Sequence, residues 1–218
     1  MNALSYIVPR TVKRASTSYN RDIRVVEENG KYKLLVNGSR QSGEYIKELW
    51  QKACAEFGII TSPDVKSILV LGVAGGTVIH LLRGIYPDAE ITGVDIDKTM
   101  IEIGKKYFGL SGVPGLTLRT EDAKVFMKKN THWDMVVIDL FIGAAIPPFV
   151  GEDEFLSDVK NSLTPNGKLL INYLYELEYK QLSDLFIVIL RKLFSNAADY
   201  KIYNNRFFYV VKYAHGDV

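Results

Sequence analysis

The chain has 218 residues, of which 47% are hydrophobic and 24% are charged, and this composition excludes a disordered, collagen-like or coiled-coil protein. Its 27 basic and 25 acidic side chains give a formal net charge of +2, so we expect no nucleic-acid partner. Cys54 is the only cysteine, and no apolar stretch has the length of a signal peptide or membrane span. We therefore expect a cytoplasmic protein that does not bind a membrane.

The first sixty residues predict a β-hairpin followed by a helix. Two alternating apolar runs flank Asn29-Gly30, and this dipeptide is a strong signal for a tight hairpin turn. The apolar stripe of the helix is formed by Ile46, Leu49, Trp50, Ala53 and Phe57. Because Pro63 ends this pattern, we predict an N-terminal appendage over residues 1–62 and one larger domain over residues 63–218.

The larger domain shows strands and helices in alternation. Ser67 to Leu71 is a continuous apolar run, typical of a strand that helices bury on both faces. The predicted strands are residues 67–71, 91–94, 116–118, 135–138 and 168–172, the helices are near 78–85, 100–108, 121–129, 154–163 and 182–193, and a final pair of strands covers 200–203 and 207–213. This order predicts a doubly wound, mostly parallel, Rossmann-like α/β sheet that ends in an antiparallel hairpin.

A glycine-rich loop, Gly72 to Thr77, follows the first strand of this domain. Small residues let the backbone approach a ligand, and the N–H groups of the next helix would point at it. The loop has Ala74 and Thr77 where a nicotinamide-dinucleotide fingerprint has glycines, and no Gly-Lys-Ser/Thr follows as in a P-loop. We interpret it as a ligand loop of another kind, with a turn made only for packing as the alternative.

Three acidic residues stand at or just after the carboxyl ends of later strands, where the ligand crevice of an open α/β sheet lies. Asp95 could bind ribose hydroxyls or cap the next helix, although Asp97 is the better cap. Asp122 could accept a hydrogen bond from an adenine amine or start a helix. Asp139 ends the fourth strand. No spacing of His, Cys and Asp predicts a metal site.

Together, these segments resemble the spermidine-synthase-like branch of the class I S-adenosylmethionine-dependent methyltransferase fold. The resemblance covers about residues 17–175 and is carried by 18–20, 36–42, 68–77, 93–97, 105–108, 121–123, 137–139, 154–155 and 163–167. It implies S-adenosylmethionine or its decarboxylated form as co-substrate, with no metal. The implied cofactor-binding residues are Gln41, Gly72, Ala74, Gly75, Gly76, Asp95, Ile96, Asp122 and Ala123, with Asp95 on the ribose and Asp122 on the adenine.

The sequence departs from the polyamine synthases at three places. They carry an acid in the glycine loop, where this chain has Ala74, and a Tyr-His pair after the hairpin, where Tyr45 is followed by Ile46. They also carry two acids after the fourth strand, where this chain has Asp139 alone. These departures favour methyl transfer over aminopropyl transfer.

We therefore expect methyl transfer to a small amine-type acceptor, with Asp139 as the catalytic residue that binds the ammonium and assists its deprotonation. The first alternative is a polyamine aminopropyltransferase, and the second is a catalytically inactive nucleoside-binding regulatory protein. The partner in either enzyme reading is a small-molecule substrate. The aromatic run from Phe207 to Tyr209 is either strand core or a dimer face, so a homodimer stays open.

Overall fold

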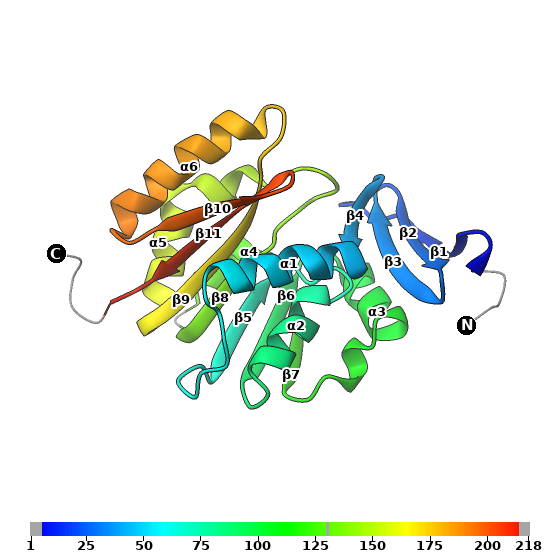
Figure 1. Ribbon diagram of the computed structural model, residues 1–218, viewed down its shortest axis with the longest axis horizontal. Helices are drawn as coiled ribbons and strands as arrows, with labels where there is room; N and C mark the ends of the chain where they lie inside the picture. Colours follow the sequence, from blue (N-terminus) through cyan, green and yellow to red (C-terminus); the bar gives the residue numbers. More distant parts are fainter. Residues whose placement is uncertain (1–5, 130, 214–218) are drawn as a thin grey trace.

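The computed structural model describes residues 6–129 and 131–213 and contains a small and a large β-sheet (Figure 1). The antiparallel small sheet has the order β1 (Arg10–Ala15), β2 (Ile23–Glu28), β3 (Lys31–Val36) and β4 (Ser39–Ser42). The predicted hairpin is confirmed, because β2 pairs with β3 and the turn residues Asn29 and Gly30 both have positive φ, 52° and 70°. β1 is largely exposed and lacks an apolar alternation, so the pattern does not predict it.

The large sheet has the predicted mixed topology. Its strands in spatial order are β10 (Ala198–Ile202), β11 (Asn205–Val211), β9 (Leu163–Leu174), β8 (Trp133–Ile138), β5 (Ser67–Leu71), β6 (Glu90–Asp95) and β7 (Leu116–Thr120). The five strands from β9 to β7 pair in parallel, whereas β11 and β10 join the edge in antiparallel fashion. The fold class expected from the sequence is therefore confirmed.

Helices cover both faces of the large sheet. They are α1 (Glu44–Glu56), α2 (Thr77–Ile85), α3 (Lys98–Tyr107), α4 (Ala123–Met127), α5 (Asp153–Ser162) and α6 (Tyr179–Leu193), with short 3-10 turns η2 (Leu110–Gly112) and η3 (Pro148–Gly151). One core lies between the sheet and α4, α5 and α6, and the other lies between the sheet and α1 and α2. No helix in the described part of the chain has the length and apolar character needed to cross a bilayer.

Helix α1 packs on the large sheet, although it precedes residue 63. Trp50 is buried, and its ring meets the Phe207 ring edge-on at 5.0 Å. The small sheet packs instead against α3, through a separate core that includes Met100 and Ile103. The division of the chain at residues 62 and 63 stays a prediction.

The terminal hairpin turns one residue earlier than the sequence pattern predicts. Tyr203 and Asn204 form the turn, and Asn205 already pairs with Ile202. Tyr203 adopts a left-handed conformation (φ 54°), its ring stacks on Tyr45 at 6.0 Å, and its hydroxyl contacts α1. This tertiary contact explains the difference. The aromatic run that follows is strand core at Phe207 and Phe208, which are both fully buried.

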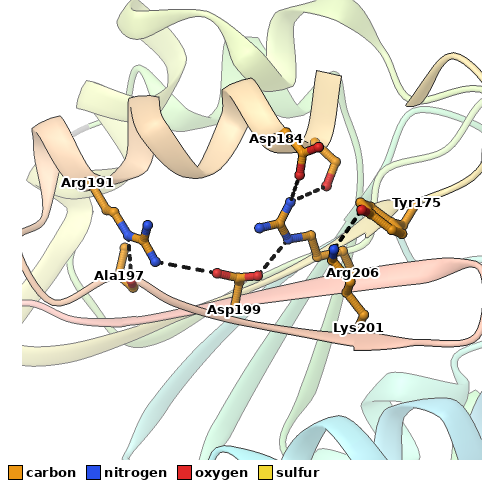
Figure 2. A network of polar contacts seen from close by, with 8 residues as sticks. Tyr175, Asp184, Arg191, Ala197, Asp199, Lys201 and Arg206 are labelled. Atoms are coloured by element: carbon orange, nitrogen blue, oxygen red, sulfur yellow. Dashed lines mark hydrogen bonds and ion pairs between the residues drawn. The ribbon is translucent and has the colours of Figure 1, made fainter. Parts of the chain in front are cut away.

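An ion-pair network around the buried Arg206 side chain holds this hairpin against α6 (Figure 2). The Arg206 side chain is 8% exposed and donates from Nε to Asp199 at 2.7 Å and from Nη1 to Asp184 at 2.6 Å. Asp199 also lies 3.5 Å from Arg191. Because successive residues of a strand face opposite sides, this anchoring of Arg206 turns Asn205 toward the other face of the sheet, which α1 covers.

Candidate functional site

The glycine loop between β5 and α2 is tightly packed. Gly72 has φ +92°, and a Cβ at this position would lie 2.1 Å from the carbonyl oxygen of Asp139. At Gly76 (φ +82°), a Cβ would lie 2.3 Å from a methyl group of Leu110. Only glycine fits such backbone conformations and distances without strain. The loop therefore brings the ends of β5 and β8 into direct contact.

The N–H groups of the loop itself are bonded within the protein. Gly72 and Gly76 donate to backbone carbonyls, and Gly75 donates to the Ser42 hydroxyl at 2.8 Å. Val73 and Ala74 donate to the Asp95 carboxylate at 3.0 and 3.1 Å. All five N–H groups of residues 72–76 therefore have a partner within the protein.

Asp95 lies at the carboxyl end of β6 and fixes the loop. One carboxylate oxygen accepts the two loop N–H groups, and the other accepts the N–H of Asp97 at 2.9 Å. Burial raises the pKa of Asp95, and the three backbone donors act against this effect. Capping of α3 is the role of Asp97, as predicted, because its carboxylate accepts from the Thr99 N–H at 3.0 Å. Asp95 itself does not cap α3, and it lines two small cavities at the carboxyl ends of the strands.

Six of the other predicted cofactor-binding residues line cavities together with Asp95, whereas Gly75 and Gly76 line neither cavity. Ile96, Asp122 and Ala123 line one cavity with it, of 60 Å³, and Gln41, Gly72 and Ala74 line a second with it, of 30 Å³. Asp122 also caps α4 by accepting from the Val125 N–H at 3.1 Å. The reading of Asp122 as the start of a helix is therefore confirmed, and its contact with an adenine stays a prediction.

These two cavities are smaller than the roughly 300 Å³ at which ligand pockets usually begin. The segment after β8 forms their common wall through Phe141 and Ile142. Gly143 holds this segment in place, since its carbonyl accepts from Gln41 Nε2 at 2.7 Å and its N–H donates to Asn20 at 3.1 Å.

A larger cavity of 410 Å³ lies on the other side of Asp139. Asp139 lines both this cavity and the 30 Å³ cavity beside Asp95. Its carboxylate accepts from Asn172 Nδ2 at 2.8 Å, and the Asn172 oxygen accepts from Asn205 Nδ2 at 2.9 Å. Burial raises the pKa of Asp139 to about 6, against the opposing effect of the Asn172 hydrogen bond.

The structure adds an acid that our sequence analysis missed. Glu176, in the connection between β9 and α6, lines the 410 Å³ cavity together with Asp139 and accepts from Asn204 Nδ2 at 2.7 Å. The sequence pattern gives no reason to select it, because it follows the predicted strand by four residues. Asn172 carries a clearer signal, as a polar residue that directly follows the buried apolar run Leu169–Ile171.

Tyr45 on α1 and Tyr173 on β9 lie in different parts of the structure. Tyr45 lines the 410 Å³ cavity. Tyr173 is buried in the opposite core, where its ring stacks on Phe186 at 4.9 Å. Among the described residues, no group of three or more His, Cys, Asp or Glu side chains is arranged to hold a metal ion.

Comparison with known proteins identifies the family. Residues 47–209 match the family model described as the spermine/spermidine synthase domain. The chain belongs to this family. The resemblance that we derived from the glycine loop and the acids after the strands is therefore confirmed.

The relatives of this chain include proteins named as aminopropyltransferases and proteins named as methyltransferases. Over 119 residues the chain is 31% identical to the polyamine aminopropyltransferase of Vibrio vulnificus, and the aligned segment covers 53% of this chain and 40% of that protein. Over 148 residues it is 29% identical to an eEF1A lysine and N-terminal methyltransferase homolog of Drosophila pseudoobscura pseudoobscura, and this aligned segment covers 63% of this chain and 22% of that protein. The matched segment thus spans less than half the length of either relative.

Solved structures share the fold of this spermine/spermidine synthase family member. A probable spermidine synthase from Corynebacterium glutamicum aligns with a TM-score of 0.78 and 17% identity over 93% of this chain and 80% of that one. Human methyltransferase-like protein 13 in complex with SAH aligns with a TM-score of 0.62 and 21% identity over 71% of this chain and 75% of that one. The doubly wound architecture is therefore shared with proteins of both names.

Proposed function

We propose that this protein is an S-adenosylmethionine-dependent methyltransferase that acts on an amine. The observation that carries the proposal is the position of Asp139, which lines both the cavity beside Asp95 and the 410 Å³ cavity. A carboxylate between a donor site and an acceptor site can bind an ammonium group and accept its proton. The raised pKa of Asp139, about 6, suits a base that acts near neutral pH.

The donor would lie along the carboxyl ends of β5, β6 and β7. Asp95 would accept the ribose hydroxyls, Ile96 and Ala123 would flank the base, and Asp122 would accept from the adenine amine. Ala74 favours S-adenosylmethionine, since a loop without a carboxylate does not repel the carboxylate of this donor. The decarboxylated form, which has a lone ammonium at this end, gains nothing from Ala74.

The reaction proposed here is an in-line displacement. The neutral amine attacks the methyl carbon, the bond between this carbon and sulfur breaks, and S-adenosylhomocysteine leaves with the electron pair. The proton lost by the amine passes to Asp139 and from there to water. The protein contributes by aligning nucleophile, carbon and sulfur, which can lower the barrier by about 7 kcal/mol or more.

Aminopropyl transfer from decarboxylated S-adenosylmethionine is a second candidate, and one observation favours it. Asp139 and Glu176 line the same cavity, and two carboxylates suit an acceptor with an ammonium at each end. The similarity to an aminopropyltransferase supports the same reading.

An assay with both donors separates the candidates. We expect the protein to methylate at least one amine in a panel when S-adenosylmethionine is supplied, and mass spectrometry of the product identifies the added group. Aminopropylated product from the decarboxylated donor alone would make aminopropyl transfer the function. Donor binding without any product across the panel would instead support a catalytically inactive nucleoside-binding protein.

A further inference from the structure

The 410 Å³ cavity contains a cation as well as its two acids. Arg40, on β4, lines this cavity together with Asp139 and Glu176. It also lines a neighbouring cavity of 340 Å³, between β3, β4 and the start of α1. Tyr45 lines both cavities as well, and the Arg40 guanidinium carbon lies 5.3 Å from the centre of its ring. Arg40 therefore stands where the two cavities meet.

Arg40 has no ion-pair partner in the part of the chain that the structure describes. The other two cations of the 340 Å³ cavity are paired, Lys31 with Glu44 at 3.1 Å and Lys33 with Glu28 at 2.7 Å. No such ion pair involves Arg40 within residues 6–129 and 131–213. A guanidinium that lies against an aromatic ring keeps its N–H groups available at its edge, and this edge matches a carboxylate in geometry.

We propose that the acceptor is an amine that also carries a carboxylate, and that Arg40 selects it. This inference rests on the proposed function. The acids would hold the amino groups, and Arg40 would bind the carboxylate at the junction of the cavities. A plain diamine offers nothing to Arg40 and places a like charge in the same cavity. Two kinds of molecule carry an amine together with a carboxylate: a basic amino acid, and a peptide with an acidic group near its lysine or N-terminal amine.

Ornithine and putrescine test this inference directly, because the two molecules differ only in the carboxylate. We would titrate each into the full chain by calorimetry, with and without saturating S-adenosylhomocysteine. We expect ornithine to bind about tenfold more tightly than putrescine, as one charge-assisted contact provides. Arg40→Gln should abolish this difference. Lys33→Gln is the matched control and should preserve it, because Lys33 is already paired with Glu28.

Equal or tighter binding of putrescine, no binding of either amine, or an unchanged ratio in Arg40→Gln would overturn the inference. A lysine peptide with a neighbouring glutamate, compared with its glutamine counterpart, separates the two sources. If the ratio of affinities between the glutamate and glutamine peptides exceeds the ratio between ornithine and putrescine, the acceptor is a peptide. If the ornithine ratio is the larger one, the acceptor is a free amino acid. Failure of S-adenosylhomocysteine to bind would refute the proposed function alone, since the titrations without nucleoside still decide the role of Arg40.

Discussion

Asp139→Asn should lower turnover by about a hundredfold or more while affinity for S-adenosylhomocysteine stays nearly unchanged. The substitution keeps the size of the side chain and its contact with Asn172, but it removes the negative charge that binds an ammonium and accepts its proton. Single-turnover rates and calorimetry on the same preparations measure the two quantities separately. Equal losses of rate and of donor affinity would mean that Asp139 holds the donor, and undiminished turnover would transfer the catalytic role to Tyr45.

The pH dependence of the same pair of proteins provides the control. Because burial raises the pKa of Asp139 to about 6, wild-type turnover should rise with pH through this value, and the residual turnover of Asp139→Asn should not show this rise.

The raised pKa of Asp139 also affects the stability of the fold. The protonated carboxyl stabilises the folded state relative to the ionised one, and this stabilisation is lost as pH rises through about 6. Asp139→Asn should therefore gain thermal stability relative to wild type near pH 8 and not near pH 4.

Gly72→Ala should destabilise the protein by about 3 kcal/mol or more. Its new Cβ would meet the Asp139 carbonyl oxygen at 2.1 Å, and the positive φ of +92° adds strain for any residue with a side chain. Both partners of this contact are backbone at the ends of buried strands, so neither moves freely. Urea unfolding measures the change in the free energy of unfolding.

Gly84→Ala is the matched control, since this glycine lies inside α2 and its added Cβ would meet nothing within 4 Å. It should stabilise the protein by up to about 1 kcal/mol, the usual difference between glycine and alanine in a helix. Wild-type stability in Gly72→Ala would show that the loop and β8 can separate. In that case the close contact would not be what positions Asp139.

The sequence predicts those parts of this structure that local chemistry determines. The left-handed turn at Asn29 follows from a dipeptide, and the parallel strands follow from apolar runs separated by helical stripes. Asp95, Asp122 and Asp139 lie at or just after the carboxyl ends of three parallel strands, and in an open α/β sheet the ligand crevice forms at these ends.

Other features depend on contacts between distant residues, and the pattern cannot show them. Tyr203 takes a left-handed conformation because its side chain reaches α1, and this moves the last turn by one residue. Glu176 and Arg40 enter the 410 Å³ cavity from a connection and from an edge strand, 136 positions apart in the sequence. The bonds from the Val73 and Ala74 N–H groups to Asp95 also join separate strand ends, and the pattern gives no sign of them.

The central claim is that an adenosyl donor binds where the glycine loop meets Asp95, and calorimetric titration with S-adenosylhomocysteine tests it most directly. The account predicts a single site in the wild-type protein, an affinity at least about tenfold lower in Asp95→Asn, and no binding of NAD. The lower affinity is expected because an amide is a weaker acceptor than a carboxylate and has one acceptor oxygen in place of two. Binding of NAD, or equal affinity of S-adenosylhomocysteine for wild type and Asp95→Asn, would contradict it.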